Sequence, residues 1–194
     1  LNTVISGTGF GAGLWSGLTT GYSQTTLNDS GGINDSVTSF TLTSAASFET
    51  ASTTTSANLT IISSSVPVAS SSGFPSKGTL LIGSEKIRYG TNVSNVFGDL
   101  TRGEDGTTAA TSSSGDAVTF VGMMLIGGEL IQYTGKSTHT IDAGVVRGVR
   151  GTTAASHADA ATVKEANDFV GWGESSSTAA STGSNIRLWS QDNW

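Results

Sequence analysis

The stretch LIGSEKIRY at residues 81–89 decides the fold, because it occurs a second time as LIGGELIQY at residues 125–133. The two copies are 44 positions apart (125 − 81 = 44). A second block, RGEDGTTAA at residues 102–110, returns as RGVRGTTAA at residues 147–155. Two blocks that recur in the same order indicate two copies of one small module.

Each copy has the pattern of a β-hairpin. Residues 79–89 form an apolar run, a Gly-Ser pair and a second run with alternating apolar residues, and residues 123–133 repeat this with Gly-Gly in the middle. Such pairs between apolar runs are typical of tight hairpin turns. We therefore predict two hairpins, with turns at residues 83–84 and 127–128.

The opening strand of the second copy is missing from its expected place. Residues 65–74 precede the first hairpin, and their counterpart in the sequence is residues 36–48, which lie upstream of the whole first copy. We therefore predict that one module is inserted in a loop of the other, since loop tips tolerate such insertions. The predicted outer module is 33–58 and 122–165, and the predicted inserted module is 59–121.

The predicted fold class is all-β. Thr, Val, Ile and aromatic residues favour strands, and the abundant Gly, Ser, Asn and Asp favour turns. Further strands are expected at 96–101 and 144–149, and a strand is preferred to a short helix at 157–165. Residues 1–32 and 166–194 are rich in Gly and Trp and are expected to form a β base, as part of a larger sheet or propeller. The chain starts at Leu1 rather than Met, so we expect a fragment or a processed chain.

Composition excludes several classes of protein. Only 12% of the residues are charged and the formal net charge is −6, so no basic stripe predicts specific nucleic-acid binding. No apolar run approaches the ~20 residues of a membrane helix, so no membrane span is expected. There is no Cys. The Gly-rich stretch at residues 7–13 lacks the Lys-Ser/Thr end of a phosphate loop, and no cofactor is expected.

One acidic and one basic residue recur in both copies. Glu85 and Arg102 return as Glu129 and Arg147. Such a pair could be catalytic, but a catalytic site seldom appears twice in tandem, and neither copy adds a nucleophile. We therefore predict a structural ion pair in each module, because a guanidinium binds a carboxylate through two parallel hydrogen bonds. We expect a protein that is not an enzyme.

The two histidines, His139 and His157, are too few for a metal site, because structural and catalytic metals need three or four ligands. No metal site is predicted.

Four aromatic residues in the terminal regions have two interpretations. They could fill the Gly-rich sheet or a subunit interface, or they could stack on host sugars. The four residues are Trp15, Tyr22, Trp172 and Trp189.

The runs GTLLIGSEKIRY (78–89) and TRGEDGTTAA (101–110) resemble a module of tailed-bacteriophage structural proteins, especially those of marine phages. The flank DFVGWGESSST (168–178) resembles a Gly/Trp-rich part of tail-tube or nozzle-like proteins. The resemblance implies a virion protein, located in the phage tail of an extracellular particle. Its expected partners are copies of itself in a ring and other virion proteins.

Two other functions are considered. A fibre or surface adhesin would bind host carbohydrate and would carry exposed aromatic residues. A depolymerase would need an acidic cleft among aromatic residues, and the sequence contains no such arrangement.

Overall fold

A computed structural model describes residues 23–167 of the chain. This part contains fourteen short β-strands and one 3-10 turn, η2 (Glu104–Gly106), and it has no α-helix. The all-β prediction is therefore confirmed. Within residues 23–167, no helix has the length and hydrophobicity of a membrane span.

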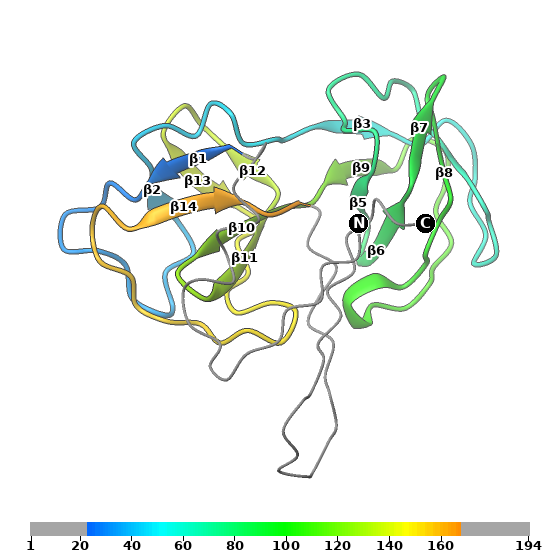
Figure 1. The fold of residues 1–194 in the computed structure, drawn as a ribbon. Helices are drawn as coiled ribbons and strands as arrows, with labels where there is room; N and C mark the ends of the chain where they lie inside the picture. The colour runs from blue at the N-terminus through cyan, green and yellow to red at the C-terminus, as the bar shows by residue number, and fades with distance from the viewer. Residues whose placement is uncertain (1–22, 168–194) are drawn as a thin grey trace, which may run out of the picture.

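The strands form two lobes, each with one four-stranded and one three-stranded antiparallel sheet (Figure 1). The first lobe, the outer module, takes its strands from both sides of residues 52–120. Its four-stranded sheet has the order β1-β14-β10-β11, and its three-stranded sheet has the order β12-β13-β2. The strands are β1 (Gln24–Thr26), β2 (Phe40–Thr41), β10 (Gly122–Ile126), β11 (Glu129–Tyr133), β12 (Gly135–Lys136), β13 (Thr140–Ala143) and β14 (Thr162–Glu165).

The second lobe, the inner module, consists of residues 52–120, whose strands pair only with one another. Its sheets have the orders β3-β9-β5-β6 and β4-β8-β7, which repeat the orders of the outer module strand for strand. The strands are β3 (Ser52–Thr54), β4 (Val66–Pro67), β5 (Gly78–Ile82), β6 (Glu85–Tyr89), β7 (Thr91–Val93), β8 (Val96–Gly98) and β9 (Ala117–Phe120).

The two predicted hairpins are confirmed. β5 pairs with β6 and β10 pairs with β11, each over five residue pairs. The turn residues Gly83 and Gly127 have φ angles of 59° and 60°, a left-handed conformation that glycine adopts without steric cost. The strand expected at 157–165 is β14, which pairs with both β1 and β10.

The bounds of the modules differ from the prediction at two points. β1 was assigned to the terminal base, but it pairs with β14 of the outer module. β3 was assigned to the outer module, but it pairs with β9 of the inner module. Both strands are three residues long and consist of Gln, Ser and Thr, so they carry no apolar alternation that could mark them in the sequence.

A third difference concerns residues 144–149, where a strand was expected. This segment contributes only an isolated bridge between Val146 and Gln132. The strand that corresponds to β8 is β13, four residues earlier than the expected strand.

Each module has its own hydrophobic core. In the outer module, Phe40, Leu42 and Phe48 pack with residues of the β10–β11 hairpin, and the Phe48 and Tyr133 rings meet edge to face at 6.2 Å. In the inner module, the Phe97 ring lies 5.2 Å from Phe74 and 4.6 Å from Tyr89. The residues 36–48 thus pack on the hairpin that follows the inner module in sequence.

Candidate functional site

The recurring Glu and Arg residues form a bidentate ion pair in each module. In the inner module, Arg102 donates from Nε to Glu85 Oε1 and from Nη2 to Glu85 Oε2, both at 2.7 Å. In the outer module, Arg147 makes the same two bonds to Glu129, also at 2.7 Å. The side chains are buried, with exposed fractions of 2% for Glu85 and 1% for Glu129.

All five N–H donors of each guanidinium have an acceptor. In the inner module, Nη1 of Arg102 donates to the carbonyls of Thr60 and Ser63, and Nη2 also donates to the carbonyl of Ala110. Because the guanidinium has five donors in a fixed fork, this set of acceptors saturates it. The arginine thereby ties the segment before β4 to the loop that leads into β9.

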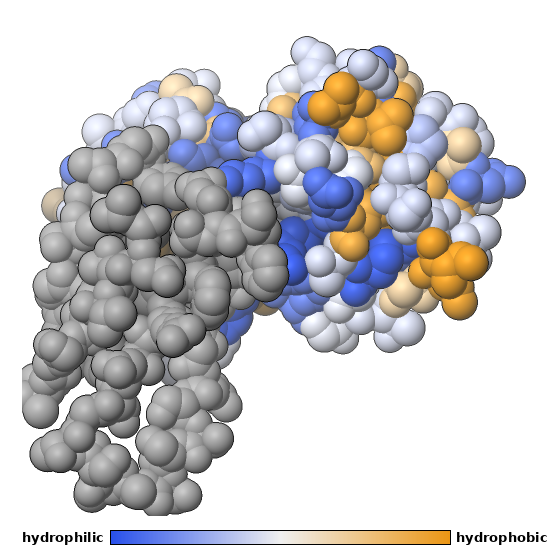
Figure 2. All heavy atoms as spheres, turned by 45° about the vertical axis from the view of Figure 1, so that its right-hand side comes forward, coloured by the Kyte–Doolittle hydropathy of each residue, from blue (hydrophilic) through white to orange (hydrophobic). Residues whose placement is uncertain are grey.

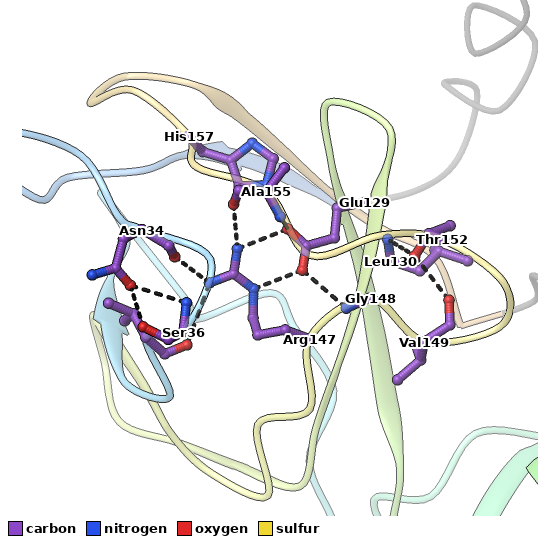
Figure 3. Close-up of polar contacts among 11 residues, drawn as sticks. Asn34, Ser36, Glu129, Leu130, Arg147, Gly148, Val149, Thr152, Ala155 and His157 are labelled. Carbon is purple, nitrogen blue, oxygen red and sulfur yellow. Dashed lines mark hydrogen bonds and ion pairs between the residues drawn. The ribbon is translucent and has the colours of Figure 1, made fainter.

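The outer module repeats this arrangement (Figure 3). Nη1 of Arg147 donates to the carbonyls of Asn34 and Val37, and Nη2 donates to the carbonyl of Ala155. The acceptors lie 26 positions before Thr60 and Ser63 (60 − 34 = 26; 63 − 37 = 26). The two modules therefore match contact by contact.

Backbone N–H groups donate further hydrogen bonds to each carboxylate. Gly103 and Ala110 donate to Glu85 at 3.1 and 2.9 Å, and Gly148 and Ala155 donate to Glu129 at 3.0 and 3.2 Å. The Arg-Gly and Thr-Thr-Ala-Ala parts of the repeated block thus supply the donors that surround the carboxylate.

The charged form of each carboxylate is favoured. Burial raises the pKa of Glu85, but the hydrogen bonds from Arg102 and from the Ala110 and Gly103 backbones outweigh it, so the pKa lies below its ordinary value. Burial likewise raises the pKa of Glu129, and Arg147, His157 and Ala155 outweigh it with the same net result.

The outer module adds a histidine that the sequence analysis did not connect with the pair. His157 Nε2 lies 2.7 Å from Glu129 Oε2, and the His157 side chain is 9% exposed. The corresponding residue of the inner module is Ser112, since Ile33 bridges to His157 as Leu59 bridges to Ser112. The repeat could not reveal this contact, because only one copy has it.

The other sequence-predicted residues are placed as follows. His139 Nδ1 lies 2.9 Å from the carbonyl oxygen of Thr43. In residues 23–167 there is no group of three or more His, Cys, Asp or Glu side chains that could hold a metal ion. The four predicted aromatic residues Trp15, Tyr22, Trp172 and Trp189 lie outside the described residues.

The Glu85–Arg102 and Glu129–Arg147 pairs each hold their own module together. Every donor and acceptor of the pair is used by its own module, and the bonds join three segments that are distant in sequence. Comparisons with known proteins give no assignment: no protein-family model, curated protein or solved structure matches the chain.

Proposed function

We propose that this chain is a structural component of a bacteriophage particle, in the tail, where it acts through contacts with copies of itself and with other particle proteins. The resemblance of its repeated runs to phage virion modules supports the phage assignment. The observation that carries the assembly role is a set of exposed aliphatic side chains on the inner module.

These side chains lie in two places on the inner module. Ile61 and Ile62 are 56% and 85% exposed in the segment before β4, and Val93 and Val96 are 66% and 37% exposed at the β7–β8 hairpin. Figure 2 shows separate hydrophobic patches on the face of the molecule that it presents. Exposed apolar patches on a protein surface favour contact with a partner surface.

The outer module has polar residues at the same positions. The 26-residue offset places Asp35 and Ser36 where the inner module has Ile61 and Ile62. Phe97 pairs with Val66 in the inner module, and Ile141 pairs with Phe40 in the outer module. These equivalent pairs give an offset of 44 residues between the copies (141 − 97 = 44). By this offset, Ser137 and Thr140 correspond to Val93 and Val96. The apolar side chains at these four positions therefore belong to the inner copy alone and are not required by the module fold, and the outer module exposes one aliphatic side chain elsewhere, Val146, at 46%.

Burial of these side chains in an assembly would be favourable, because each aliphatic side chain of this size contributes ~1.5–3 kcal/mol when it is fully buried. A heterologous contact repeated from copy to copy closes into a ring when the rotation between neighbouring copies is a whole fraction of a turn. No observation favours carbohydrate binding equally, since the large hydrophobic side chains exposed in residues 23–167 are all Ile or Val, whereas stacking on sugars needs aromatic faces.

Sedimentation velocity and native mass spectrometry of the 194-residue chain test the assembly role. We expect an oligomer of defined copy number, which Ile62→Asp and Val93→Asp shift to the monomer. Ser36→Asp places the same charge at the matching position of the outer module and is expected to leave the oligomer intact. A parent chain that stays monomeric at high concentration would contradict the role.

The phage assignment has its own test. Peptides of this chain are expected in particles purified from the phage that encodes it, at a copy number that agrees with the oligomer. Their absence from purified particles, with the chain present in the infected cell, would reject the assignment.

A further inference from the structure

The two modules touch through the same loop of each copy. This loop begins at the glycine after Arg102 and Arg147, and it spans residues 103–106 in the inner module and 148–151 in the outer module. Asp105 and Arg150 hold the same position in it, three residues after Arg102 and Arg147. Their φ angles are 52° and 54°, so both residues adopt the left-handed backbone conformation.

An ion pair joins these equivalent residues across the two modules. Arg150 Nε lies 3.0 Å from Asp105 Oδ1, with side-chain exposed fractions of 7% and 16%. If both copies had Asp, or both had Arg, like charges would meet at this contact. The two loops differ as Glu-Asp and Val-Arg, and the difference creates charge complementarity between the copies.

The inner module orients the acidic partner. Lys86 Nζ lies 3.3 Å from Asp105 Oδ2, so Asp105 is held between Lys86 of its own module and Arg150 of the other. The outer module has Leu130 at the position of Lys86. A lysine there would stand beside Arg150, and its replacement by leucine removes that repulsion.

The chain crosses between the modules at another place. Phe120 N donates to the carbonyl of Ala51 at 2.8 Å, and Val121, which is 2% exposed, directly joins β9 to β10. Val121 N donates to the carbonyl of Thr79, near the open end of the β5–β6 hairpin. Asn167 adds a contact here, because its side chain donates to Glu49 Oε2 at 3.2 Å.

The ion pair lies at the opposite ends of the hairpins. The η2 loop contacts the turn end of β5–β6, where Lys86 N donates to Thr107 Oγ1, and Leu130 N donates to Thr152 Oγ1 in the other copy. A hairpin of five-residue strands is ~13 Å long at ~3.3 Å per residue. The crossing at the open ends of the hairpins and the ion pair at their turn ends are thus about one hairpin length apart.

We propose that the Asp105–Arg150 ion pair is an orientation lock, which fixes the angle between the two modules about the chain crossing at residues 49–51 and 121. Rotation of one lobe against the other about this crossing is the motion that the ion pair would restrict. The lock removes this rotation and holds the inner module, with its apolar surface, in one position relative to the outer module. This inference does not depend on the proposed function.

Distance measurement between spin labels tests the lock, and the absence of Cys from the chain makes the labelling specific. Ala117→Cys in β9 and Thr162→Cys in β14 place labels at exposed, equivalent strand positions near the turn ends of the hairpins. Double electron–electron resonance on the labelled 194-residue chain is expected to give one narrow distance distribution.

Arg150→Gln and Asp105→Asn are expected to broaden this distribution at least twofold, with the circular dichroism spectrum unchanged. The matched control is Arg88→Gln, which removes the Arg88–Glu104 ion pair from the same loop but within one module, and it is expected to keep the narrow distribution. If Arg150→Gln and Asp105→Asn both retain the parent width and mean distance, the lock is rejected. If one variant fails to fold, the other decides the result.

Discussion

Glu129 binds Arg147 through both of its oxygens at 2.7 Å, and Glu85 binds Arg102 with the same geometry and the same distances in the other module. This equality indicates that the ion pair belongs to the module fold itself. In each copy the pair joins the hairpin, the Arg-Gly loop and the segment before the second strand.

Glu85→Gln is expected to lower the free energy of unfolding of the inner module by ~3–5 kcal/mol, because it leaves the Arg102 charge buried without its carboxylate. Urea unfolding measures this loss. The matched control is Glu104→Gln, which breaks the more exposed Arg88–Glu104 pair of the same module at 3.6 Å and is expected to cost less than ~1 kcal/mol. Equal losses for the two variants would contradict the assigned role of Glu85.

Acid is expected to destabilise both modules. The folded-state pKa values of Glu85 and Glu129 lie below their ordinary values, so the stability that they contribute is present above the unfolded pKa of ~4.3. It is lost as the pH falls through the folded pKa, because the folded state then binds protons that the unfolded state already holds. Thermal melts from pH 7 to pH 2 are expected to fall below ~pH 4, and to fall less steeply for Glu85→Gln. An equally steep fall in that variant would show that other groups control the acid response.

Gly122 is expected to tolerate no side chain. It lies opposite Tyr133 in the β10–β11 hairpin, and a Cβ atom on Gly122 would stand 2.2 Å from the Tyr133 ring. Gly122→Ala is therefore expected to lower the free energy of unfolding by ~1–3 kcal/mol or more through overpacking. Gly128→Ala in the turn of the same hairpin is the control, since a Cβ there meets nothing within 4 Å, and its effect is expected within ~0.5 kcal/mol. Chemical denaturation of both variants measures the difference. Indistinguishable denaturation midpoints for Gly122→Ala and Gly128→Ala would contradict the steric argument.

His157→Ser converts the outer-module site to the residue found in the inner module. It removes the 2.7 Å contact between His157 Nε2 and Glu129 Oε2, and the expected loss is ~1.5–3 kcal/mol, the usual value for a hydrogen bond to a charged group. Ser112→Ala, at the equivalent inner position, removes a buried hydroxyl that has no hydrogen-bond partner, so it is expected to cause no loss in the free energy of unfolding. A His157→Ser variant as stable as the parent would mean that the imidazole contributes nothing to the stability of the Glu129–Arg147 pair.

The sequence predicted those parts of the fold that carry an apolar pattern or recur in both copies. The hairpins at residues 79–89 and 123–133 have both signals, and Glu85 and Glu129 stand at the same place after each turn. The edge strands β1 and β3 have neither signal, because they consist of short polar residues that hold their places by pairing with β14 and β9.

The contacts that differ between the copies were also beyond prediction. A repeat reveals what the copies share, and it cannot reveal that His157 reaches Glu129 or that Arg150 meets Asp105. Both contacts depend on residues from separate segments that become neighbours only after folding. Sequence spacing gives no measure of such a distance.

Hydrogen exchange with mass spectrometry of the parent, Glu85→Gln and Glu129→Gln tests most directly whether each buried pair holds its own module together. We predict that Glu85→Gln loses amide protection in residues 52–120 and keeps it in 23–48 and 122–167, and that Glu129→Gln gives the reverse pattern. Uniform loss of protection across both modules, or unchanged protection in both variants, would contradict the account.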